Sequence, residues 1–407
     1  MADGVAVARI GEVKKSTSVP VIASQRIRRP EEAEQVLREG QADLIGMARA
    51  LIADPDWVRK AQGNDVGTIR LCLGDLQDCR NHLSGGLRCL VNPEVGRQIE
   101  ATLIDAPQRR SRDSRRAVVV GAGPAGLECA RRLAECGLTV TVFEASGRVG
   151  GQLNAVKRRR GREDLFDLVA FQQAEIQRLG VKIVLNHDAN VSDLLAERAD
   201  VVVIATGAIG KPLEEISRAV RESPTVVSVW DVVTTDFACN GGNVIVIDDG
   251  SGDWPMLTSV DVLCQMGCAV TVISTGSSVT KNVPIESQGT LYESLRDANV
   301  RWHCGAESLR ITSAGISYVD AGTRQVIEVL GEVVVVETGR MPNNELWNRG
   351  ESELPTTVEF FAVGDCLTPR GLSSAVSDAL EVEIAITQSV RVGSAATPRN
   401  LQFVGSR

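Results

Sequence analysis

The stretch RAVVVGAGPAGLECARRLAECGLTVTVFEASGRVGG (residues 116–151) decides the fold of this chain. An apolar run leads directly into a turn that contains Gly121, Gly123 and Gly126. The turn opens an amphipathic segment of helical period, and a second apolar run then ends at Glu144. Strand, glycine turn, helix and strand in this order predict a βαβ unit of a parallel sheet.

The three glycines have separate roles in a G-x-G-x-x-G turn. The first permits the tight turn, the second lets the backbone approach a pyrophosphate, and the third lets the helix pack on the sheet. The helix N-terminus adds N–H groups and partial positive charge for the phosphates. Glu144, 18 residues after Gly126, is placed to accept hydrogen bonds from an adenosine ribose. The pattern predicts dinucleotide binding, and the alternative is a tight structural turn.

Three further segments extend this pattern along the chain. EASGRVGGQL (144–153) follows the acid and contains a pair of glycines. ADVVVIATGA (199–208) reads as a strand with an Ala-Thr-Gly turn, and VEFFAVGDC (358–366) reads as a strand with a Gly-Asp pair. Over 117–390, these elements in this order resemble the two-dinucleotide-binding-domain flavoproteins of the glutathione-reductase-like superfamily.

The resemblance implies an FAD site in which these turns surround the cofactor and Asp365 holds the ribityl chain. The positions that match the superfamily's FAD contacts are Gly121, Gly123, Pro124, Ala125, Gly126, Glu144, Ala145, Arg148, Gly151, Gln152, Ala205, Thr206, Gly207, Gly364 and Asp365. The implied chemistry is hydride or electron transfer by the flavin. The sequence therefore names no acid–base residue.

A second unit, GGNVIVIDDGSGDWPMLTSVDVLCQMGCAVTVISTGS (241–277), repeats the order of strand, turn, helix and strand. In the superfamily the domain inserted here usually binds NAD(P)H. In this sequence Pro255 replaces the third glycine, and the second strand ends at Ser274 without an acid for a ribose or a nearby arginine for a 2′-phosphate. Two interpretations stay open, an NAD(P)H-binding domain and a structural domain that keeps the fold without the ligand.

Residues 1–65 have the pattern of alternating strands and helices. VPVIAS (19–24) and ADLIGMA (42–48) are short apolar strands, and RPEEAEQVLREG (29–40) is a helix that begins at a proline and ends at a glycine. The alternation implies parallel strands. Two parallel strands do not form a stable sheet alone, because their edges and faces stay exposed. We therefore expect further strands from this chain or from another.

The segment RLCLGDLQDCRNHLSGGLRCLVNP (70–93) follows this block and carries three cysteines. The order of strand–helix block, cysteine segment, CLVNPEVGR and FAD unit resembles the old-yellow-enzyme-like multidomain flavoproteins. These include 2,4-dienoyl-CoA reductase and trimethylamine dehydrogenase. The resemblance implies that 1–65 is the last two βα units of a TIM barrel that holds FMN, and that the cysteine loop holds a [4Fe–4S] cluster.

The family's FMN phosphate contacts lie around the seventh and eighth barrel strands, where the matching positions are Arg26, Gly46 and Arg49. The earlier strands, which face the substrate in the family, are missing from this sequence. We expect FMN only if a partner completes the barrel, and we expect a split subunit or a truncated product that is incomplete alone. The expected partners are a barrel-containing subunit or a second copy of the chain, with a small-molecule redox substrate or electron carrier.

The cysteine loop departs from the family motif of four cysteines, because the matching positions are Cys72, Asp75, Cys79 and Cys89. Soft thiolate ligands suit cluster iron. Asp75 could supply the fourth ligand, or the fourth iron could be lost to give a three-iron form; Asp78 and His82 are weaker candidates. The alternatives are a degenerate loop without a cluster, and a zinc site of three thiolates with Asp or His.

Composition restricts the partners and the compartment. The net charge of −8 disfavours nucleic acid, because phosphate binding needs concentrated positive charge. No signal peptide and no 18-residue uncharged apolar stretch is visible, so no membrane association is expected. Ten cysteines without a secretory signal indicate a reducing compartment, and we expect the cytoplasm.

Together these patterns predict an α/β chain, the remnant of a (β/α)8 barrel followed by a double dinucleotide-binding module. The predicted domains are two barrel units at 1–65, a cysteine loop and linker at 66–116, an FAD-binding domain at 117–240 and 340–395, and an inserted NAD(P)-binding-like domain at 241–339. The predicted function is an FAD-dependent oxidoreductase that moves electrons between NAD(P)H or an electron carrier and a second redox centre. It would form part of an amine dehydrogenase, a demethylase or an enoate reductase. The competing interpretation is a non-catalytic nucleotide-binding subunit, or a truncated product, that docks on a barrel-bearing partner.

Overall fold

The computed structural model describes residues 4, 6–63, 65–80, 86–97, 115–156, 161–213, 224–235, 237–239 and 241–392. His82 and most of the predicted linker lie outside the described residues. The chain forms two compact units. The first comprises Met1–Gly151, Asp164–Ala208 and Pro342–Arg407, and the second comprises Gln152–Glu163 and Ile209–Met341.

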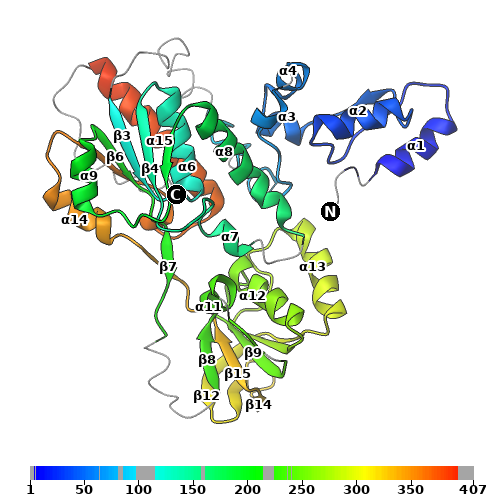
Figure 1. The fold of residues 1–407 in the computed structure, drawn as a ribbon. Coiled ribbons are helices and arrows are strands. Elements are labelled where there is room, and N and C mark those ends of the chain that lie inside the picture. Colours follow the sequence, from blue (N-terminus) through cyan, green and yellow to red (C-terminus); the bar gives the residue numbers. More distant parts are fainter. Residues whose placement is uncertain are drawn as a thin grey trace. The chain divides into compact units, whose positions relative to one another are not determined.

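The first unit begins with a block of short strands and helices, drawn in blue in Figure 1. Its elements are α1 (Val7–Lys15), β1 (Ile22–Ala23), α2 (Pro30–Arg38), β2 (Leu44–Ile45), α3 (Arg49–Ala53), α4 (Trp57–Gln62) and the 3-10 helix η1 (Val66–Thr68). The two strands are parallel, with Ile22 opposite Leu44. α2 begins at Pro30 because proline tolerates the first helical position. The predicted alternation of strands and helices is therefore present.

A five-stranded parallel sheet forms the centre of the first unit. Its strands, in order across the sheet, are β17 (Glu359–Ala362), β6 (Val201–Ile204), β3 (Arg116–Val120), β4 (Thr139–Phe143) and β5 (Lys182–Val184). β6 is buried along its whole length, and β3 is buried apart from its first residue. Strands covered on both faces have unbroken apolar sequences, which explains the valine runs of these two strands.

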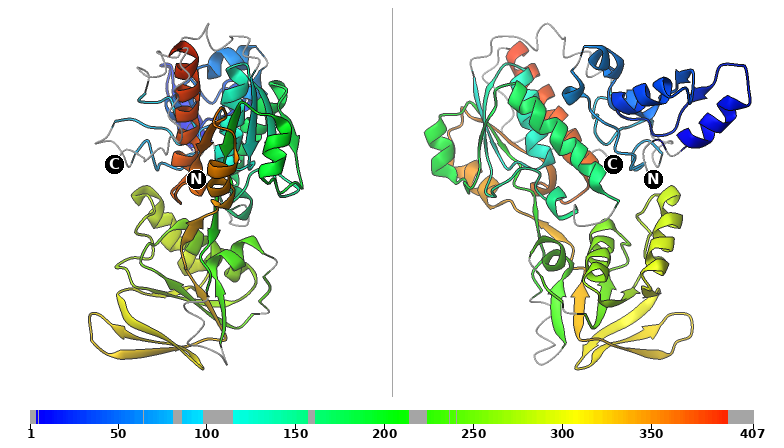
Figure 2. Two further views of the ribbon diagram at one scale, coloured as in Figure 1. Left: turned by 90° about the vertical axis from the view of Figure 1, so that its left-hand side faces the viewer. Right: turned by 45° about the vertical axis from the view of Figure 1, so that its right-hand side comes forward.

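Helices cover both faces of this sheet. α6 (Pro124–Glu135) packs against α8 (Phe166–Arg178) and α15 (Leu372–Val392). α9 (Val191–Glu197) packs against α14 (Glu345–Glu353). Figures 1 and 2 show these two groups of helices on opposite sides of the strands. A short 3-10 helix, η5 (Gly364–Cys366), follows β17 at the carboxyl edge of the sheet.

The second unit has a five-stranded parallel sheet of its own. Its order is β11 (Arg301–His303), β10 (Ala269–Ser274), β9 (Asn243–Asp248), β15 (Val333–Val336) and β8 (Thr225–Ser228). An antiparallel sheet, seen in yellow in Figure 2, consists of β12 (Ala306–Thr312), β13 (Gly315–Asp320) and β14 (Val326–Leu330). The helices are α7 (Leu153–Val156), α11 (Val229–Thr234), α12 (Trp254–Gln265) and α13 (Ile285–Asp297).

The chain passes between the units after Gly151, at η4 (Glu163–Leu165), along β7 (Ala208–Gly210) and along β16 (Arg340–Pro342). β8 belongs to the second sheet, beside β15, whereas the predicted first domain extends to residue 240. The physical reason is that a four-residue apolar strand does not identify its partner, and β15 lies far along the chain.

The α/β fold with two parallel-sheet units agrees with the predicted fold class. In the part of the chain that the structure describes, no helix is both long enough and apolar enough to cross a membrane.

Candidate functional site

The glycine turn after β3 leaves no room for a Cβ atom at its first and third glycines. Gly121 has a φ of 105°, and a Cβ atom built there would lie 2.3 Å from the carbonyl oxygen of Ala205. A Cβ atom on Gly126 would lie 1.9 Å from the carbonyl oxygen of Gly121. α6 begins at Pro124 with Gly123 as its N-cap, so its first N–H groups face the turn. This is the backbone arrangement that binds a pyrophosphate.

Glu144 connects the end of β4 to this turn. Its carboxylate accepts hydrogen bonds from the backbone N–H of Ala122 at 2.6 Å and from the hydroxyl of Ser146 at 2.7 Å. The loop that follows returns to the turn at Gly151, where a Cβ atom would lie 2.9 Å from the Cα atom of Gly123. The acid and the glycine pair, separate in the sequence pattern, therefore meet the same turn.

The Ala-Thr-Gly turn after β6 and the Gly-Asp pair after β17 also reach this place. The contact of Gly121 with Ala205 joins the Ala-Thr-Gly turn to the glycine turn. A Cβ atom on Gly364 would lie 2.9 Å from the Cβ atom of Ala125, so the Gly-Asp turn also lies against the glycine turn. All three turns lie at the carboxyl ends of parallel strands, where open α/β sheets bind their ligands.

Several predicted positions have other surroundings. Thr206 donates a hydrogen bond from its hydroxyl to the carbonyl oxygen of Asn343. Ala145 and Arg148 are exposed in the loop after Glu144. Gln152 falls in the second unit, where it accepts a hydrogen bond from Arg340 at 3.2 Å.

Asp378, on α15, supports the Gly-Asp turn and was missed by sequence reasoning. Its carboxylate accepts hydrogen bonds from the backbone N–H of Gly364 at 2.8 Å and from the guanidinium of Arg370. Burial raises the pKa of Asp378, and the charge of Arg370 opposes this effect. The backbone N–H of Arg370 donates to Asp365 at 2.9 Å, so both aspartates hold the same turn. The available signal was an acid on the buried face of an apolar helix.

The equivalent turn of the second unit is occupied by carboxylates of the protein. Asp248 accepts a hydrogen bond from the backbone N–H of Gly252 at 3.1 Å. Asp249 accepts one from the backbone N–H of Ser251 at 2.9 Å, and Asp253 caps the N-terminus of α12. In the turn of a nucleotide site, such N–H groups face the phosphates.

Two further side chains shape this second turn. Burial raises the pKa of Glu337, which follows β15, to about 7, although the backbone N–H of Gly339 donates to it at 2.8 Å. The nearby carboxylates, Asp249 first among them, add to the shift. Arg162 stacks on the ring of Trp254, with 3.4 Å between the guanidinium carbon and the ring centre. The sequence had indicated no arginine near this turn.

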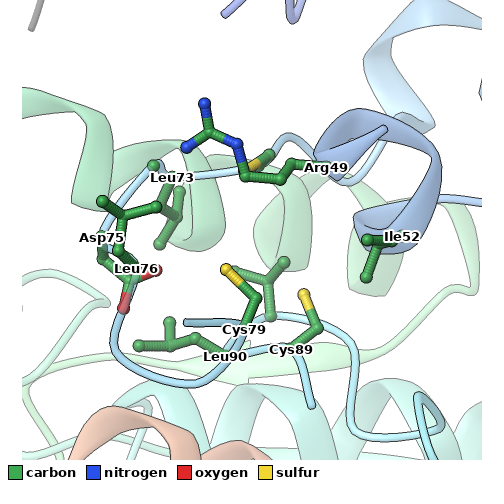
Figure 3. A pocket seen from close by; sticks show the side chains of 11 residues that line it. Arg49, Ile52, Leu73, Asp75, Leu76, Cys79, Cys89 and Leu90 are labelled. Carbon is green, nitrogen blue, oxygen red and sulfur yellow. The ribbon is translucent and has the colours of Figure 1, made fainter. Parts of the chain in front are cut away.

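The four predicted metal-binding positions line one pocket of about 20 Å³, together with Arg49 and several leucines. Figure 3 shows the sulfur atoms of Cys79 and Cys89 turned into this pocket. Its volume is on the order of one water molecule, so the side chains must move apart to admit a cluster. Among the described residues, no three His, Cys, Asp or Glu side chains are arranged to hold a single metal ion.

The cysteine loop is held in place by its apolar residues. Leu73 and Leu90 are buried in a core that includes Phe171 of α8. Burial raises the pKa of the thiols of Cys72 and Cys79, and raises that of Cys89 to about 11. Three thiols and a carboxylate in one apolar pocket form a donor set that suits iron by its chemistry.

A second cavity, of about 430 Å³, is lined by the predicted FMN positions Arg26, Gly46 and Arg49. Cys72 and Gly74 line both cavities, so the cysteine pocket adjoins this one. Guanidinium groups around a cavity suit a phosphate. The predicted residues of both sites are therefore brought together in space.

Ion pairs join this N-terminal block to α8 and to the turn before it. Arg26 pairs with Asp164. Arg28 pairs with Asp164 at 2.8 Å and with Asp167 at 2.9 Å, and also donates to the carbonyl oxygen of Cys72 at 2.9 Å. Arg29 pairs with Asp167 at 2.7 Å. No local sequence pattern indicated these contacts, because the partners lie far apart along the chain.

A family model described as pyridine nucleotide-disulphide oxidoreductase matches residues 115–379, a range that includes both glycine turns. The chain belongs to the pyridine nucleotide-disulphide oxidoreductase family. Residues 6–65 match a second model, the NADH:flavin oxidoreductase / NADH oxidase family. The two matches confirm the predicted resemblance to multidomain flavoproteins, and both families are oxidoreductases.

Two curated relatives illustrate the likeness. A metal reductase of Desulforamulus reducens is 30% identical over 402 residues, covering 90% of this chain and 58% of the relative. An N,N-dimethylglycine/sarcosine dehydrogenase of Chromohalobacter salexigens is 30% identical over 413 residues, covering 91% of this chain and 58% of the relative. This family member therefore spans somewhat more than half the length of these relatives.

Among solved structures, a 2-naphthoyl-CoA reductase in complex with 2-naphthoyl-CoA matches with a TM-score of 0.81 and 25% identity. The match covers 94% of this chain and 57% of that structure.

Proposed function

We propose that this chain is the FAD-binding part of a flavin-dependent oxidoreductase and passes electrons between NAD(P)H or an electron carrier and a second redox centre. The observation that supports FAD is the meeting of three turns at the carboxyl ends of β3, β6 and β17, with glycines where no Cβ atom fits. The turn of Gly121, Gly123 and Gly126 would hold the pyrophosphate. Glu144 would bind the adenosine ribose, and Asp365 would bind the ribityl chain. FAD, when bound, supplies hydride and single-electron transfer.

The decisive experiment is anaerobic purification followed by an absorbance spectrum and flavin extraction. We expect one FAD per chain, reduced by NADH, NADPH or a chemical electron donor. A colourless protein, or one that carries only an adenine nucleotide, would support a non-catalytic subunit instead.

For the second redox centre, we propose an iron–sulfur cluster in the cysteine pocket, with Cys72, Cys79, Cys89 and Asp75 as its ligands. The proposal is supported by the common pocket, its leucine walls and its shared border with the arginine-lined cavity. The side chains would have to separate on loading, since the pocket is small.

The test of this cluster is an iron and sulfide assay of the wild type and of Asp75→Cys. Restoring a fourth thiolate should raise iron content and slow its loss to air. Asp56→Cys, which adds a thiol at an exposed position, is the matched control. Iron absent from both proteins, with FAD present, would sink the cluster proposal and leave the FAD proposal standing.

We further propose that additional barrel strands, in a partner subunit or another copy, cover the N-terminal block and complete an FMN site at Arg26, Gly46 and Arg49. Ile22 and Leu44, opposite one another on the two-stranded sheet, are 58% and 53% exposed. A buried barrel strand would not expose such side chains. Sedimentation and FMN analysis test this proposal, and a monomer without FMN counts against it.

The relatives' names guide the substrate class, which we propose as a small amine or an activated alkene. One relative is named a dehydrogenase of N,N-dimethylglycine and sarcosine, and another is named a multifunctional alkene reductase/demethylase. All ten cysteines are free, which supports a reducing compartment such as the cytoplasm. Comparing the rates at which the protein oxidises dimethylglycine and reduces an enoyl thioester would distinguish the two substrate classes.

A further inference from the structure

Two thiols of the second unit meet at one backbone carbonyl, away from the glycine turn of that unit. The Cys239 thiol donates to the carbonyl oxygen of Gly241 at 3.0 Å, and the Cys268 thiol lies 3.9 Å from the same oxygen. Burial, followed by a hydrogen bond with the Cys239 thiol, raises the pKa of Cys268 to about 12. The two thiols therefore gather around one carbonyl oxygen.

The pairing of two strands brings the chain near Gly241 close to Cys268. Cys239 precedes β9 and Cys268 precedes β10, and the two strands are parallel neighbours. Gly241 and Gly242 have φ values of 82° and 89°, which turn the chain back before β9 begins. The backbone N–H of Ala269 donates to the carbonyl oxygen of Gly242 at 2.9 Å and extends the ladder to this point. The carbonyl oxygen of Gly241, which both thiols approach, is thus held next to the start of β10.

The surroundings protect one thiol and leave the other accessible. Cys268 is 8% exposed and belongs to the apolar core of the second unit, whereas Cys239 is half-buried at the edge of this core. Cys264, on α12 and four residues before Cys268, packs against the same core. A small oxidant would therefore reach Cys239 first, and Cys268 would be the nearby resolving thiol.

We propose that Cys239 and Cys268 are a disulfide-forming pair that exchanges with small disulfides such as oxidised glutathione. The Cys239 thiolate attacks one glutathione sulfur, forms a mixed disulfide and releases one glutathione thiolate. The Cys268 thiol then loses its proton to solvent and attacks the Cys239 sulfur, which breaks the mixed disulfide and releases the second glutathione. Because the pKa of Cys268 is raised, this is the slower of the two steps. The protein gives up two electrons and two protons, and one oxidised glutathione becomes two reduced molecules.

The bond would tie the segment before β9 to the turn before β10. Both lie at the amino ends of the strands, whereas the carboxylate-filled glycine turn lies at their carboxyl ends. The pair is therefore separate from any nucleotide site of this unit. A cross-link restrains the unfolded chain, so oxidation should stabilise the second unit without blocking its ligand site.

The test treats the full-length purified chain with oxidised glutathione, alkylates the remaining thiols after denaturation, and maps the peptides by mass spectrometry. We expect a peptide that joins Cys239 to Cys268, and a rise in melting temperature that dithiothreitol reverses. Cys239→Ser and Cys268→Ala should each lose both effects. Cys264→Ser is the matched control and should keep them.

Two results would overturn the proposal. One is that Cys239 and Cys268 are both alkylated, and so remained reduced, although other accessible thiols of the same protein have formed mixed disulfides with glutathione. The other is a cross-link from Cys239 to Cys264 in place of Cys268. Because peptide mapping does not depend on activity, both readouts remain available if a variant is poorly active.

Discussion

The two glycine turns of this chain have the same order of strand, turn and helix but differ in the number of carboxylates that accept hydrogen bonds from them. In the first, the helix N-terminus follows Gly123 and Pro124, and the acid Glu144 reaches the turn from the neighbouring strand. In the second, Asp248, Asp249 and Asp253 all accept hydrogen bonds from the turn itself. A shared fold therefore does not imply a shared ligand, because three added carboxylates repel a pyrophosphate.

The largest effect is expected from Gly126→Ala in the first turn. The new Cβ atom would lie 1.9 Å from the carbonyl oxygen of Gly121, so α6 must move away from the sheet. We expect FAD affinity to fall at least about a hundredfold, equivalent to about 2.8 kcal/mol, measured by quenching of flavin fluorescence. Gly289→Ala is the control, because a Cβ atom there meets nothing within 4 Å. Unchanged FAD affinity in Gly126→Ala would place the dinucleotide elsewhere.

The next effect concerns Glu337 beside the second turn. Its pKa is about 7 in the folded chain against an ordinary 4.5, so the fold favours the protonated carboxyl. The stability from this preference is complete below about pH 4.5 and is lost as the pH rises through 7. Glu337→Gln removes the charge and keeps an acceptor for the N–H of Gly339. It should raise the free energy of unfolding at pH 8 by about 2 kcal/mol, after allowance for partial exposure.

Urea unfolding at pH 5 and pH 8 measures this effect. At pH 5 the wild-type carboxyl is already protonated in the folded state, so the two proteins should differ little. If Glu337→Gln raised the free energy of unfolding equally at pH 5 and pH 8, the charge of the carboxylate would not be the cause of the increase.

The smallest effect is expected from Asp253→Ser at the start of α12. Serine keeps the N-cap hydrogen bond but removes a negative charge from the position of a phosphate. NADH affinity should rise about twofold to fivefold, corresponding to about 0.3–1 kcal/mol, as measured by titration of NADH fluorescence. Asp261→Asn, on the same helix but away from the turn, is the control. Weaker NADH binding by Asp253→Ser would show that this carboxylate supports the nucleotide.

The features that the sequence predicts well are those whose parts lie close together along the chain. The first turn and Glu144 fall within 30 residues, and their residue types alone specify the geometry. Asp378, Arg162 and Asp164 were missed because each reaches its site only through helix packing or a long loop. The aspartates of the second turn are visible in the sequence. Whether they accept hydrogen bonds from backbone N–H groups depends on backbone dihedral angles, which the sequence does not specify.

The cysteine loop lies between these cases. The sequence identified which side chains gather there, and the structure places all four around one pocket. The narrow volume of that pocket depends on how Leu73 and Leu90 pack, which no spacing of cysteines encodes.

The ion pairs of Arg28 have a practical consequence for handling this protein. The Arg28 side chain is 3% exposed and bridges two aspartates, while pairs such as Lys15 with Glu12 are on the open surface. Dissolved ions screen the surface pairs but hardly reach the buried guanidinium. Concentrated sodium chloride should therefore wash contaminants from a column without loosening the N-terminal block, whereas guanidinium chloride would unfold the chain.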